Sequence, residues 1–448
     1  MSLHSKASAL FRNLGVLTLL TLALPFNAAI VGIALLYSRI RSLAEPPKPS
    51  SQTSQTILIT GGKMTKALQL ARSFANAGHR VILVETHKYW LSGHRFSNAV
   101  DRFYTVPDPA QDPEAYTQAL QRLVEQEQVD TFIPVSSPVA SYYDAIAGQQ
   151  LPSHCQVLHF TPEVTQTLDN KYMLCEQARV LGLSAPKAYL INDPQQILSF
   201  DFEADGSEYI LKSIRYDSVS RLDLTKLPCS DMETYVERLP ISKENPWIMQ
   251  EFIRGQEYCT HSTVRNGQIR LHCCAKSSPF QVNYESIEKP EIYAWVSKFV
   301  AGMNLTGQIS FDLIQTEDGA VYPIECNPRT HSAITMFYDH PGVADAYLKD
   351  SQHDQETPIF PLPNSQPTYW IYQELWRLTG IRSWEQLQAW ITKINQGTDG
   401  ILQVSDPLPF LMVHHWQIPL LLLGNLQKLK GWMRIDFNIG KLVESGGD

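Results

Sequence analysis

Two carboxylates and one amide interrupt apolar residues in the stretch 311–329, FDLIQTEDGAVYPIECNPR. Asp-Gly at 318–319, between two β-rich runs, predicts a hairpin with a two-residue turn. In that register Asp312 lies directly opposite Glu325, and Asn327 shares their face of the sheet. Carboxylate and amide oxygens are groups with which proteins hold Mg²⁺ beside substrate phosphates. The spacing therefore predicts that Asp312, Glu325 and Asn327 bind Mg²⁺, with Mn²⁺ as an alternative ion.

The plainer interpretation of these acids is a solvated hairpin with scattered charges. However, opposed like charges destabilise a sheet unless a cation neutralises them. Asp312 lies within Ile-Ser-Phe-Asp-Leu-Ile and Glu325 within Tyr-Pro-Ile-Glu-Cys. Acids in such apolar strands are rarely left unpaired, so their surroundings favour the metal site.

Three lysines upstream lie where an anion could bind. Lys171 stands at the predicted start of a helix, and Lys212 lies on an apolar strand, where a charge is costly without an anionic partner. A second hairpin has Asn-Gly at 266–267, the preferred pair for a type I′ turn, and its register places Glu257 opposite Lys276. Each lysine alone is most simply a solvated charge or half of an ion pair. Together they indicate phosphate binding.

Length and composition indicate a multidomain α/β protein. The chain has 448 residues, a length that predicts about three domains. Its net charge of −8, without a basic patch, argues against nucleic acid as a partner. The seven cysteines include no Cys-x-x-Cys pair, which indicates a reducing compartment without structural disulfides.

Residues 1–43 are predicted to form a membrane anchor. The stretch 14–37 carries no charge and is long enough, as a helix, to cross the hydrocarbon core of a bilayer. It exceeds the usual apolar length of a signal peptide, while Pro25 and Asn27 leave a kinked or hairpin-like insertion open. Basic residues on both flanks leave the orientation undecided. A polar Pro/Ser/Gln linker follows at 44–56.

Residues 57–160 predict a Rossmann-like domain. A strand, a glycine turn, a helix and a second strand form a βαβ unit, and the alternation continues after it. A dinucleotide fingerprint is absent, because Gly61-Gly62 lacks the G-x-G-x-x-G spacing. The loops 94–97 and 136–138 follow strands, where open α/β sheets bind ligands. Whether these loops bind a ligand or are simply solvated is left open.

The C-terminal segment 351–448 contains predicted helices around 369–378 and 384–393, followed by a strongly apolar stretch at 408–426. Prolines and histidines interrupt that stretch, so we expect no second complete membrane span. It lies in the membrane interface, with the lysines at 428–430 at headgroup level, or it closes the core of the protein. The two options stay open.

The blocks described above, in this order, resemble the ATP-grasp superfamily. Its members hold Mg²⁺ with an Asp and a Glu-x-Asn, and many continue with Asn-Pro-Arg, as this chain does at 327–329. The resemblance implies an α/β ATP-grasp domain at 161–350, with a small lobe at about 165–248 and a large lobe at about 249–350. The stretch 247–257 is similar to the hinge that holds adenine between the lobes.

The same resemblance implies roles around the nucleotide. In this interpretation Lys171, Lys212 and Lys276 contact the phosphates, Gln250 faces the adenine amino group, Ile253 offers its amide, and Glu257 binds the ribose. The chain departs from the pattern at 213–221, where many members have a glycine-rich lid. Arg215 and Arg221 could supply the charge that backbone amides supply elsewhere.

A closer resemblance covers nearly the whole chain. The chain is similar to the mycosporine-glycine synthases of cyanobacteria in the stretches GGKMTKALQLARSF, HKYWLSGHRFS, PWIMQEFI and ECNPRTHSAITMFY. This implies that ATP, 4-deoxygadusol and glycine are the substrates, that an enol phosphate forms, and that Lys276, Arg329 and His331 act on the transferred phosphoryl group or its acceptor. Because ATP is cytosolic, the catalytic domain is expected on the cytoplasmic side of the membrane. A homodimer is one option for the oligomeric state.

Two other functions stay open. The first is a carboxylate-amine ligase that forms an acyl phosphate. The second is a membrane-tethered, non-catalytic regulator that binds nucleotide, which the nonstandard lid suggests. The intact set of predicted metal ligands argues against the regulator, because such ligands serve chiefly in phosphoryl transfer.

Overall fold

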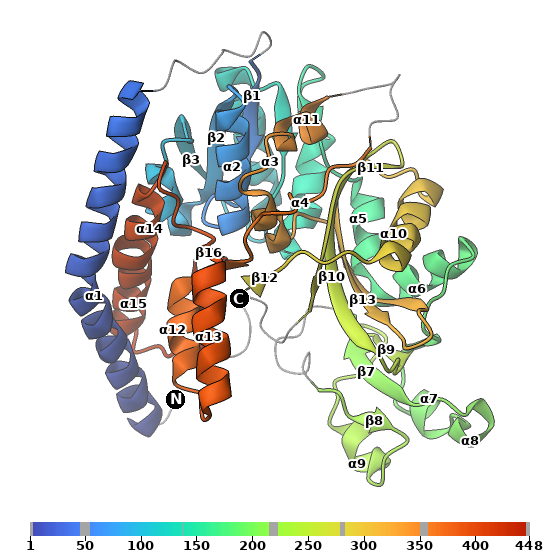
Figure 1. The fold of residues 1–448 in the computed structure, drawn as a ribbon. Helices are drawn as coiled ribbons and strands as arrows, with labels where there is room; N and C mark the ends of the chain where they lie inside the picture. Colours follow the sequence, from blue (N-terminus) through green and yellow to red (C-terminus); the bar gives the residue numbers. More distant parts are fainter. Residues whose placement is uncertain are drawn as a thin grey trace.

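The computed structural model describes residues 3–44, 54–136, 138–214, 223–277, 283–349 and 357–444. A five-stranded parallel sheet lies at its centre, with two four-stranded antiparallel sheets on one side and a long N-terminal helix on the other (Figure 1). The architecture is α/β, as predicted.

The parallel sheet has five strands in the order β3-β2-β1-β4-β5. Its elements, in chain order, are β1 (Thr56–Ile59), α2 (Thr65–Asn76), β2 (Arg80–Thr86), η1 (His87–Tyr89), η2 (Gly93–Phe96), β3 (Arg102–Val106), α3 (Pro113–Glu127), β4 (Thr131–Ile133), α4 (Pro138–Gly148) and β5 (Gln156–Val157). Ile57, Leu58 and Ile59 are fully buried, as expected for a parallel strand covered on both faces. The predicted βαβ unit is confirmed.

The first antiparallel sheet, called the β7 sheet below, has the order β6-β9-β7-β8. Its elements are β6 (Ala188–Ile191), α7 (Gln195–Leu198), α8 (Phe202–Asp205), β7 (Tyr209–Ser213), β8 (Lys226–Leu227), α9 (Met232–Glu237) and β9 (Trp247–Glu251). Tyr209, Leu211 and Met249 pack in one hydrophobic core. Because side chains alternate along a strand, Lys212 and Gln250 lie on the opposite face.

The second antiparallel sheet, called the β13 sheet, has the order β11-β10-β13-β14. Its strands are β10 (Gln256–Arg265), β11 (Gln268–Lys276), β13 (Gly307–Gln315) and β14 (Val321–Asn327); its helices are α5 (Pro162–Asp169), α6 (Lys171–Val180) and α10 (Pro290–Gly302). Leu174 of α6 and Phe299 of α10 pack with Phe311 in one core, so these helices cover one face of the sheet. The Asn170 side chain caps α6 by accepting from the backbone amide of Tyr172, which confirms the predicted helix start.

The C-terminal segment folds back onto the parallel sheet. The remaining elements are β12 (Asn283–Tyr284), η3 (Ser332–Phe337), α11 (Val343–Leu348), β15 (Thr368–Tyr369), α12 (Ile371–Leu378), α13 (Trp384–Gln396), β16 (Thr398–Asp399), α14 (Leu408–Met412), the π-helical η4 (Val413–Gln417), α15 (Ile418–Gln427), β17 (Arg434–Asp436) and β18 (Lys441–Val443). The predicted helices at 369–378 and 384–393 are therefore present. In the apolar stretch 408–426, Phe410 and Val413 close the main core, whereas Leu423 is exposed.

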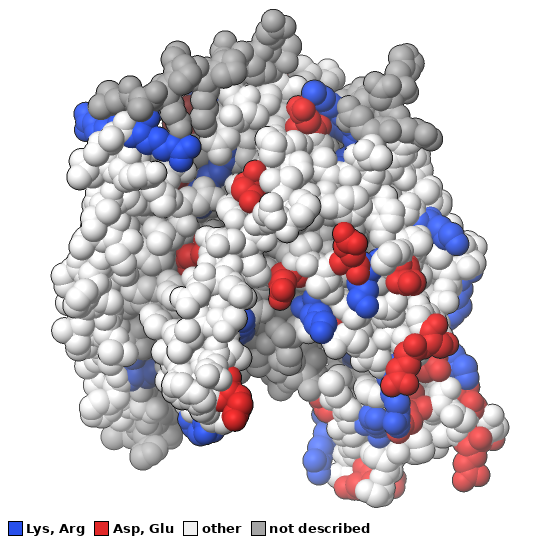
Figure 2. All heavy atoms as spheres, viewed as in Figure 1, with Lys and Arg blue, Asp and Glu red and all other residues white. Residues whose placement is uncertain are grey.

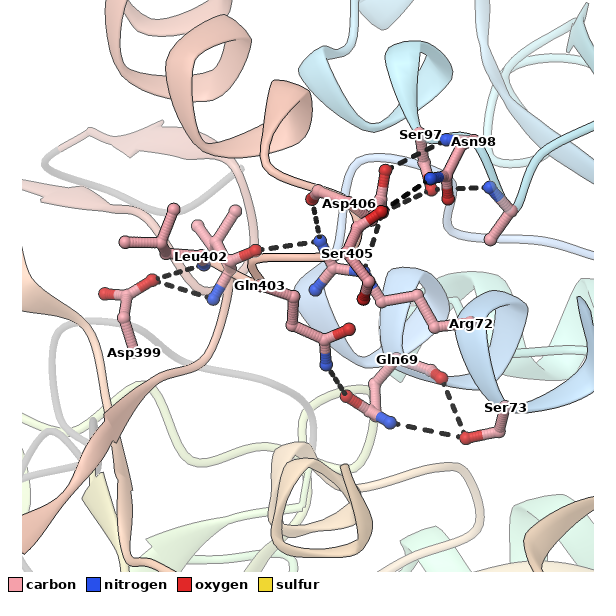
Figure 3. A network of polar contacts seen from close by, with 12 residues as sticks. Gln69, Arg72, Ser73, Ser97, Asn98, Asp399, Leu402, Gln403, Ser405 and Asp406 are labelled. Carbon is pink, nitrogen blue, oxygen red and sulfur yellow. Dashed lines mark hydrogen bonds and ion pairs between the residues drawn. The ribbon is translucent and has the colours of Figure 1, made fainter. Parts of the chain in front are cut away.

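A buried polar network joins this segment to helix α2 (Figure 3). The guanidinium of Arg72 donates to the Asp406 carboxylate at 2.8 Å and to the backbone carbonyl of Ile401 at 2.9 Å. The hydroxyl of Ser97 and the backbone amide of Asn98 also donate to Asp406, at 2.6 and 2.9 Å. The ion pair is almost fully buried, with 3% and 4% of the two side chains exposed.

We expect Asp406→Ala to lower the free energy of unfolding by about 3–5 kcal/mol, because it leaves the Arg72 charge buried without its partner. The matched control is Asp345→Ala, which breaks the exposed pair between Asp345 and Lys349 and should change stability by less than about 0.5 kcal/mol. Denaturant unfolding of the three proteins measures the difference. Equal stability of the two variants would contradict the role assigned to Asp406.

The loop 94–97, left open as a ligand site, is covered by the C-terminal segment. His94 is completely buried, and its Nδ1 lies 3.2 Å from the carbonyl oxygen of Gly62. A Cβ added to Gly93 would stand 2.4 Å from the backbone nitrogen of Val413, so only glycine allows this approach. Ser136 donates to Thr60 within the same domain, and Ser137 lies outside the described residues.

Helix α1 (Leu3–Ala44) is continuous through Pro25, so the sequence does not form a hairpin within it. Within it, Lys6–Arg41 contains an 18-residue window with a mean hydropathy of 2.2. By length and composition alone, this is the one helix in the described ranges that could cross a membrane. The helix packs beside α14 and α15, along one side of the molecule (Figure 1).

Candidate functional site

The predicted pair of opposed acids is present. Asp312 of β13 lies directly across from Glu325 of β14, and Asn327 pairs with Ser310 two residues further along. On the neighbouring strand Glu257 points to the same face, because Cys259, two residues after it, pairs with Asp312. The structure therefore brings three acids to one face of the β13 sheet.

The route to this register differs from the prediction. Gln315 pairs with Val321, and the amide of Thr316 donates to the carbonyl of Ala320 at 3.0 Å, so the turn has three residues rather than two. Gly319 adopts φ 87°, as expected where a three-residue loop needs a left-handed residue. A bulge between Asp312 and Leu313 then shifts the register by one residue. The two departures cancel, which is why the predicted acid pair is correct.

The second hairpin contains one uncompensated bulge, and the predicted pairing of Lys276 with Glu257 is wrong. Asn266 and Gly267 both have positive φ, as a type I′ turn requires. A shift between Thr263 and Val264 then places Tyr258, rather than Glu257, opposite Lys276. Because a slip of one residue exchanges the two faces of a strand, Lys276 does not stand beside Glu257.

Glu257 instead accepts a hydrogen bond of 2.6 Å from the hydroxyl of Ser277. Lys276 is exposed at the end of β11. Its contact with ATP stays a prediction, which the strand register does not support.

The proximity of the acids affects the pKa of Asp312. Partial burial, followed by the charges of Glu325 and Glu257, raises the pKa of Asp312 to about 8. Without a cation, this carboxyl is therefore mostly protonated at neutral pH. A divalent ion would remove the repulsion between Asp312 and Glu325, since each carboxylate would face positive charge.

Three cations surround these acids. The Lys171 ammonium lies 3.7 Å from the Glu325 carboxylate. Burial lowers the pKa of Lys212, and the charge of Glu325 partly offsets that effect. Burial also lowers the pKa of Arg329, and the charges of Asp169 and Glu325 partly offset that decrease. Lysines from the β7 sheet and α6 thus face acids from the β13 sheet.

Gln250 offers an unused acceptor on the β7 sheet. Its side chain is 1% exposed, and its amide nitrogen lies 3.6 Å from the sulfur of Cys175. The side-chain oxygen is buried without a hydrogen-bond partner. Such an atom costs free energy unless a ligand donates to it, and the amino group of an adenine is a donor of that kind. Ile253 lies in the connection between β9 and β10.

Arg329 and His331 follow β14 and differ in charge. An Arg329 Nη donates to the side-chain oxygen of Asn327 at 2.5 Å, so this amide is engaged by arginine. Burial, aided by the charges of Arg329 and Lys66, lowers the pKa of His331 to about 3. His331 is therefore neutral at pH 7. It can form hydrogen bonds to an acceptor molecule, but it adds no positive charge.

The donor set fits a hard cation held jointly with phosphate. Within the ranges that the structure describes, no group of three or more His, Cys, Asp or Glu side chains could hold a metal ion alone. Asp312, Glu325 and Asn327 supply two carboxylates and one amide oxygen, which suits Mg²⁺, an ion that commonly takes its other ligands from phosphate and water.

Sequence reasoning missed Lys66 of α2. Its ammonium donates to the carbonyl of Thr330 at 2.7 Å, and burial together with the nearby Arg329 charge lowers its pKa well below the usual value. The available signal was a lysine in the first turn of the helix that follows the glycines at 61–62. Only the contact between the parallel sheet and the β14 end brings it to His331. Arg215 and Arg221 of the expected lid lie outside the described residues.

Two antiparallel sheets that present acids and lysines to one another, beside a parallel sheet, are consistent with the ATP-grasp fold expected from the sequence. Among solved structures with this fold, N5-carboxyaminoimidazole ribonucleotide synthetase in its ADP complex matches with a TM-score of 0.50 and 15% identity, over 65% of this chain and 75% of that one. The N5-carboxyaminoimidazole synthetase of Staphylococcus aureus also reaches 0.50, at 13% identity over the same shares. An L-amino acid ligase from Bacillus licheniformis gives 0.45 at 16% identity, over 62% of this chain and 68% of that one.

These identities show a common fold only. The chain matches no known protein-family model and none of the curated proteins.

Proposed function

We propose that this chain is an ATP-dependent ligase that forms a carbon–nitrogen bond. The observation that carries the proposal is the opposed pair Asp312–Glu325, which faces Lys171, Lys212 and Arg329. A site of acids alone would repel a triphosphate. A site of lysines alone could bind phosphate, but it would not explain the two opposed acids. The combination suits MgATP, and the fold is shared with N5-carboxyaminoimidazole ribonucleotide synthetase, whose structure is an ADP complex.

Each residue has a role in this mechanism. Lys171 and Lys212 neutralise phosphate oxygens, Gln250 accepts from adenine, and Glu257 binds the ribose. Mg²⁺, held by Asp312, Glu325 and Asn327, would withdraw charge from the transferred phosphoryl group when it is bound. Arg329 stabilises the charge that develops on that group, so the residues act mainly by positioning and electrostatics.

The resemblance of the sequence to mycosporine-glycine synthases supports 4-deoxygadusol and glycine as the substrates. An enolised 1,3-diketone is a vinylogous carboxylic acid, so its enol oxygen can accept the γ-phosphoryl group of ATP. ADP is released in this step, and the enol proton passes to solvent. The glycine amine then attacks the activated carbon, and the C–O bond breaks with inorganic phosphate as the leaving group. The amine proton passes to solvent. We assign to neutral His331 a hydrogen bond to the acceptor. The catalytic side faces the cytoplasm, where ATP is present.

The test is phosphate release by the full chain in detergent with MgATP, 4-deoxygadusol and glycine, followed by an ultraviolet spectrum. Phosphate release that requires both substrates, with a new absorption band, is the expected result. Turnover with other acids and amines but not with this pair would favour a carboxylate-amine ligase. Nucleotide binding without turnover on any acceptor would overturn the ligase and favour a regulator.

Arg329→Ala is expected to lower turnover by about 100-fold or more, with nucleotide affinity largely kept, because Arg329 acts on the transferred group and not on adenine or ribose. Arg122→Ala, an exposed arginine on α3, is the matched control. Steady-state phosphate release and ADP titration separate the two quantities. Full activity of the Arg329 variant would remove Arg329 from the mechanism.

A further inference from the structure

Helix α1 is attached to the body of the protein along one side. Its buried residues are spaced three, four or seven positions apart, that is one or two helical turns, as a single stripe of a helix requires: Ala9, Asn13, Leu20, Asn27, Val31 and Ala34. The stripe consists of small residues, two asparagines and one leucine. The face that contacts the protein is therefore the more polar face of the helix.

Hydrogen bonds fix this stripe at two places. The Asn27 amide nitrogen lies 2.5 Å from the Tyr372 hydroxyl and 2.7 Å from Nε2 of His415. Near the N-terminus, the Arg12 guanidinium donates to the carbonyl of Trp432 at 2.7 Å and lies 3.9 Å from the centre of its ring. The Trp432 indole donates to Asn13. At about 1.5 Å per residue, the two places are roughly 20 Å apart, so α1 lies along the body.

The outward face of α1 carries the large apolar side chains. The most exposed of them, between 63% and 75%, are Phe11, Leu19, Leu22, Phe26, Ile33 and Leu36. Trp416 and Leu423 of the neighbouring η4 and α15 are also exposed, at 41% and 42%. Figure 2 shows few charges over this side of the molecule. Polar residues toward the protein and bulky apolar residues outward reverse the pattern of a helix that faces water.

We propose that the outward face of α1, together with Trp416 and Leu423, is a membrane-binding surface on which the protein lies in one leaflet, with α1 parallel to the bilayer plane. Charge supports lipid as the occupant. Residues 1–44 contain four basic and no acidic residues, although the whole chain has a net charge of −8. Basic residues beside an apolar helix face favour anionic headgroups.

A spanning orientation conflicts with the contacts of Asn27. If α1 crossed the bilayer, Asn27 would lie near its midplane and would draw Tyr372 of α12 in with it. The next turn of α12 carries Glu374 and Arg377, a charged pair whose transfer into hydrocarbon is costly. The anchor expected from the sequence is thus reinterpreted as a helix that lies in the membrane surface and stays attached to the protein.

Flotation of the full chain with preformed vesicles tests this. We expect binding to phosphatidylcholine vesicles and stronger binding when phosphatidylglycerol is included. Phe26→Glu combined with Ile33→Glu should lower the bound fraction about tenfold or more, because charges enter the lipid-facing side. Val180→Glu, the same change at a 79% exposed position on α6, is the control and should bind as the wild type does. Thermal melting verifies that each variant folds.

A tag at the N-terminus, attacked by protease added outside the vesicles, tells the two orientations apart. The tag should be removed from vesicle-bound protein, since both ends of α1 stay on the same side. Protection of the tag would show a spanning helix and overturn the proposal, as would absence of flotation. A wild-type dimer that the double glutamate variant converts to monomer, with neither protein floating, would assign the surface to a second copy. None of these readouts depends on ligase activity.

Discussion

Asp312→Asn is expected to make the metal-free protein more stable and to lower Mg²⁺-dependent ATP turnover by about 1,000-fold or more. Both effects have one cause. The Asp312 carboxylate stands against Glu325 on a partly buried face, where its charge is unfavourable until a cation arrives. Asparagine removes the repulsion, and with it one of the two carboxylates that would hold the metal.

The stability gain has a defined pH dependence. The pKa of Asp312 is about 8 in the folded protein and about 4 in an unfolded chain. Because the folded state disfavours the ionised form, the cost is fully present above pH 8 and disappears as the pH falls toward 4. At pH 8 without Mg²⁺, the free energy of unfolding of the variant should therefore exceed that of the wild type by about 1 kcal/mol or more. Near pH 4 the two free energies of unfolding should be equal.

Thermal unfolding at the two pH values, with and without Mg²⁺, measures this. Added Mg²⁺ should stabilise the wild type and not the variant, because only the wild type retains both carboxylates. Glu317→Gln, which removes an exposed acid from the same hairpin's turn, is the control for charge alone. If Asp312→Asn lost stability at pH 8, the Asp312 and Glu325 carboxylates would not repel one another in the metal-free protein.

Lys212→Met is expected to weaken binding of ADP with Mg²⁺ by about 10- to 100-fold and to lower turnover by about 1,000-fold. Lys212 projects from β7 toward Glu325, Glu257 and Asp312, away from the hydrophobic core of its own sheet. An ammonium at that position compensates phosphate charge. Methionine keeps the length of the side chain and removes only the charge, so the fold should be preserved.

The control for this change lies on the neighbouring strand. Lys226 of β8 pairs with the half-exposed Glu208 at 3.2 Å, outside the group of acids. Lys226→Met should leave ADP affinity within about twofold of the wild type, since exposed ion pairs contribute little. Calorimetric titration of both variants decides the matter. Equal losses in the two proteins would mean that Lys212 acts through the stability of the β7 sheet and not through phosphate.

Local signals in the sequence determined much of the fold. Contacts between residues close in the chain determine the strand, glycine turn and helix at residues 56–76. They also determine the cap at Asn170 and the type I′ turn at Asn266. The facing of Asp312 and Glu325 was also predictable, although the turn has one residue more than predicted and a bulge compensates for it.

Only the tertiary structure decided the rest, because the forces involved act between residues distant in sequence. A bulge after Thr263 moves Lys276 away from Glu257, and nothing in the local pattern marks it. Lys66 reaches Thr330 only because the parallel sheet packs against the end of β14. The hydropathy of α1 is the same whether the helix spans a membrane or lies upon it. Its buried stripe, fixed by Asn27 against Tyr372 and His415, is the tertiary observation on which our proposal of a surface-lying helix rests.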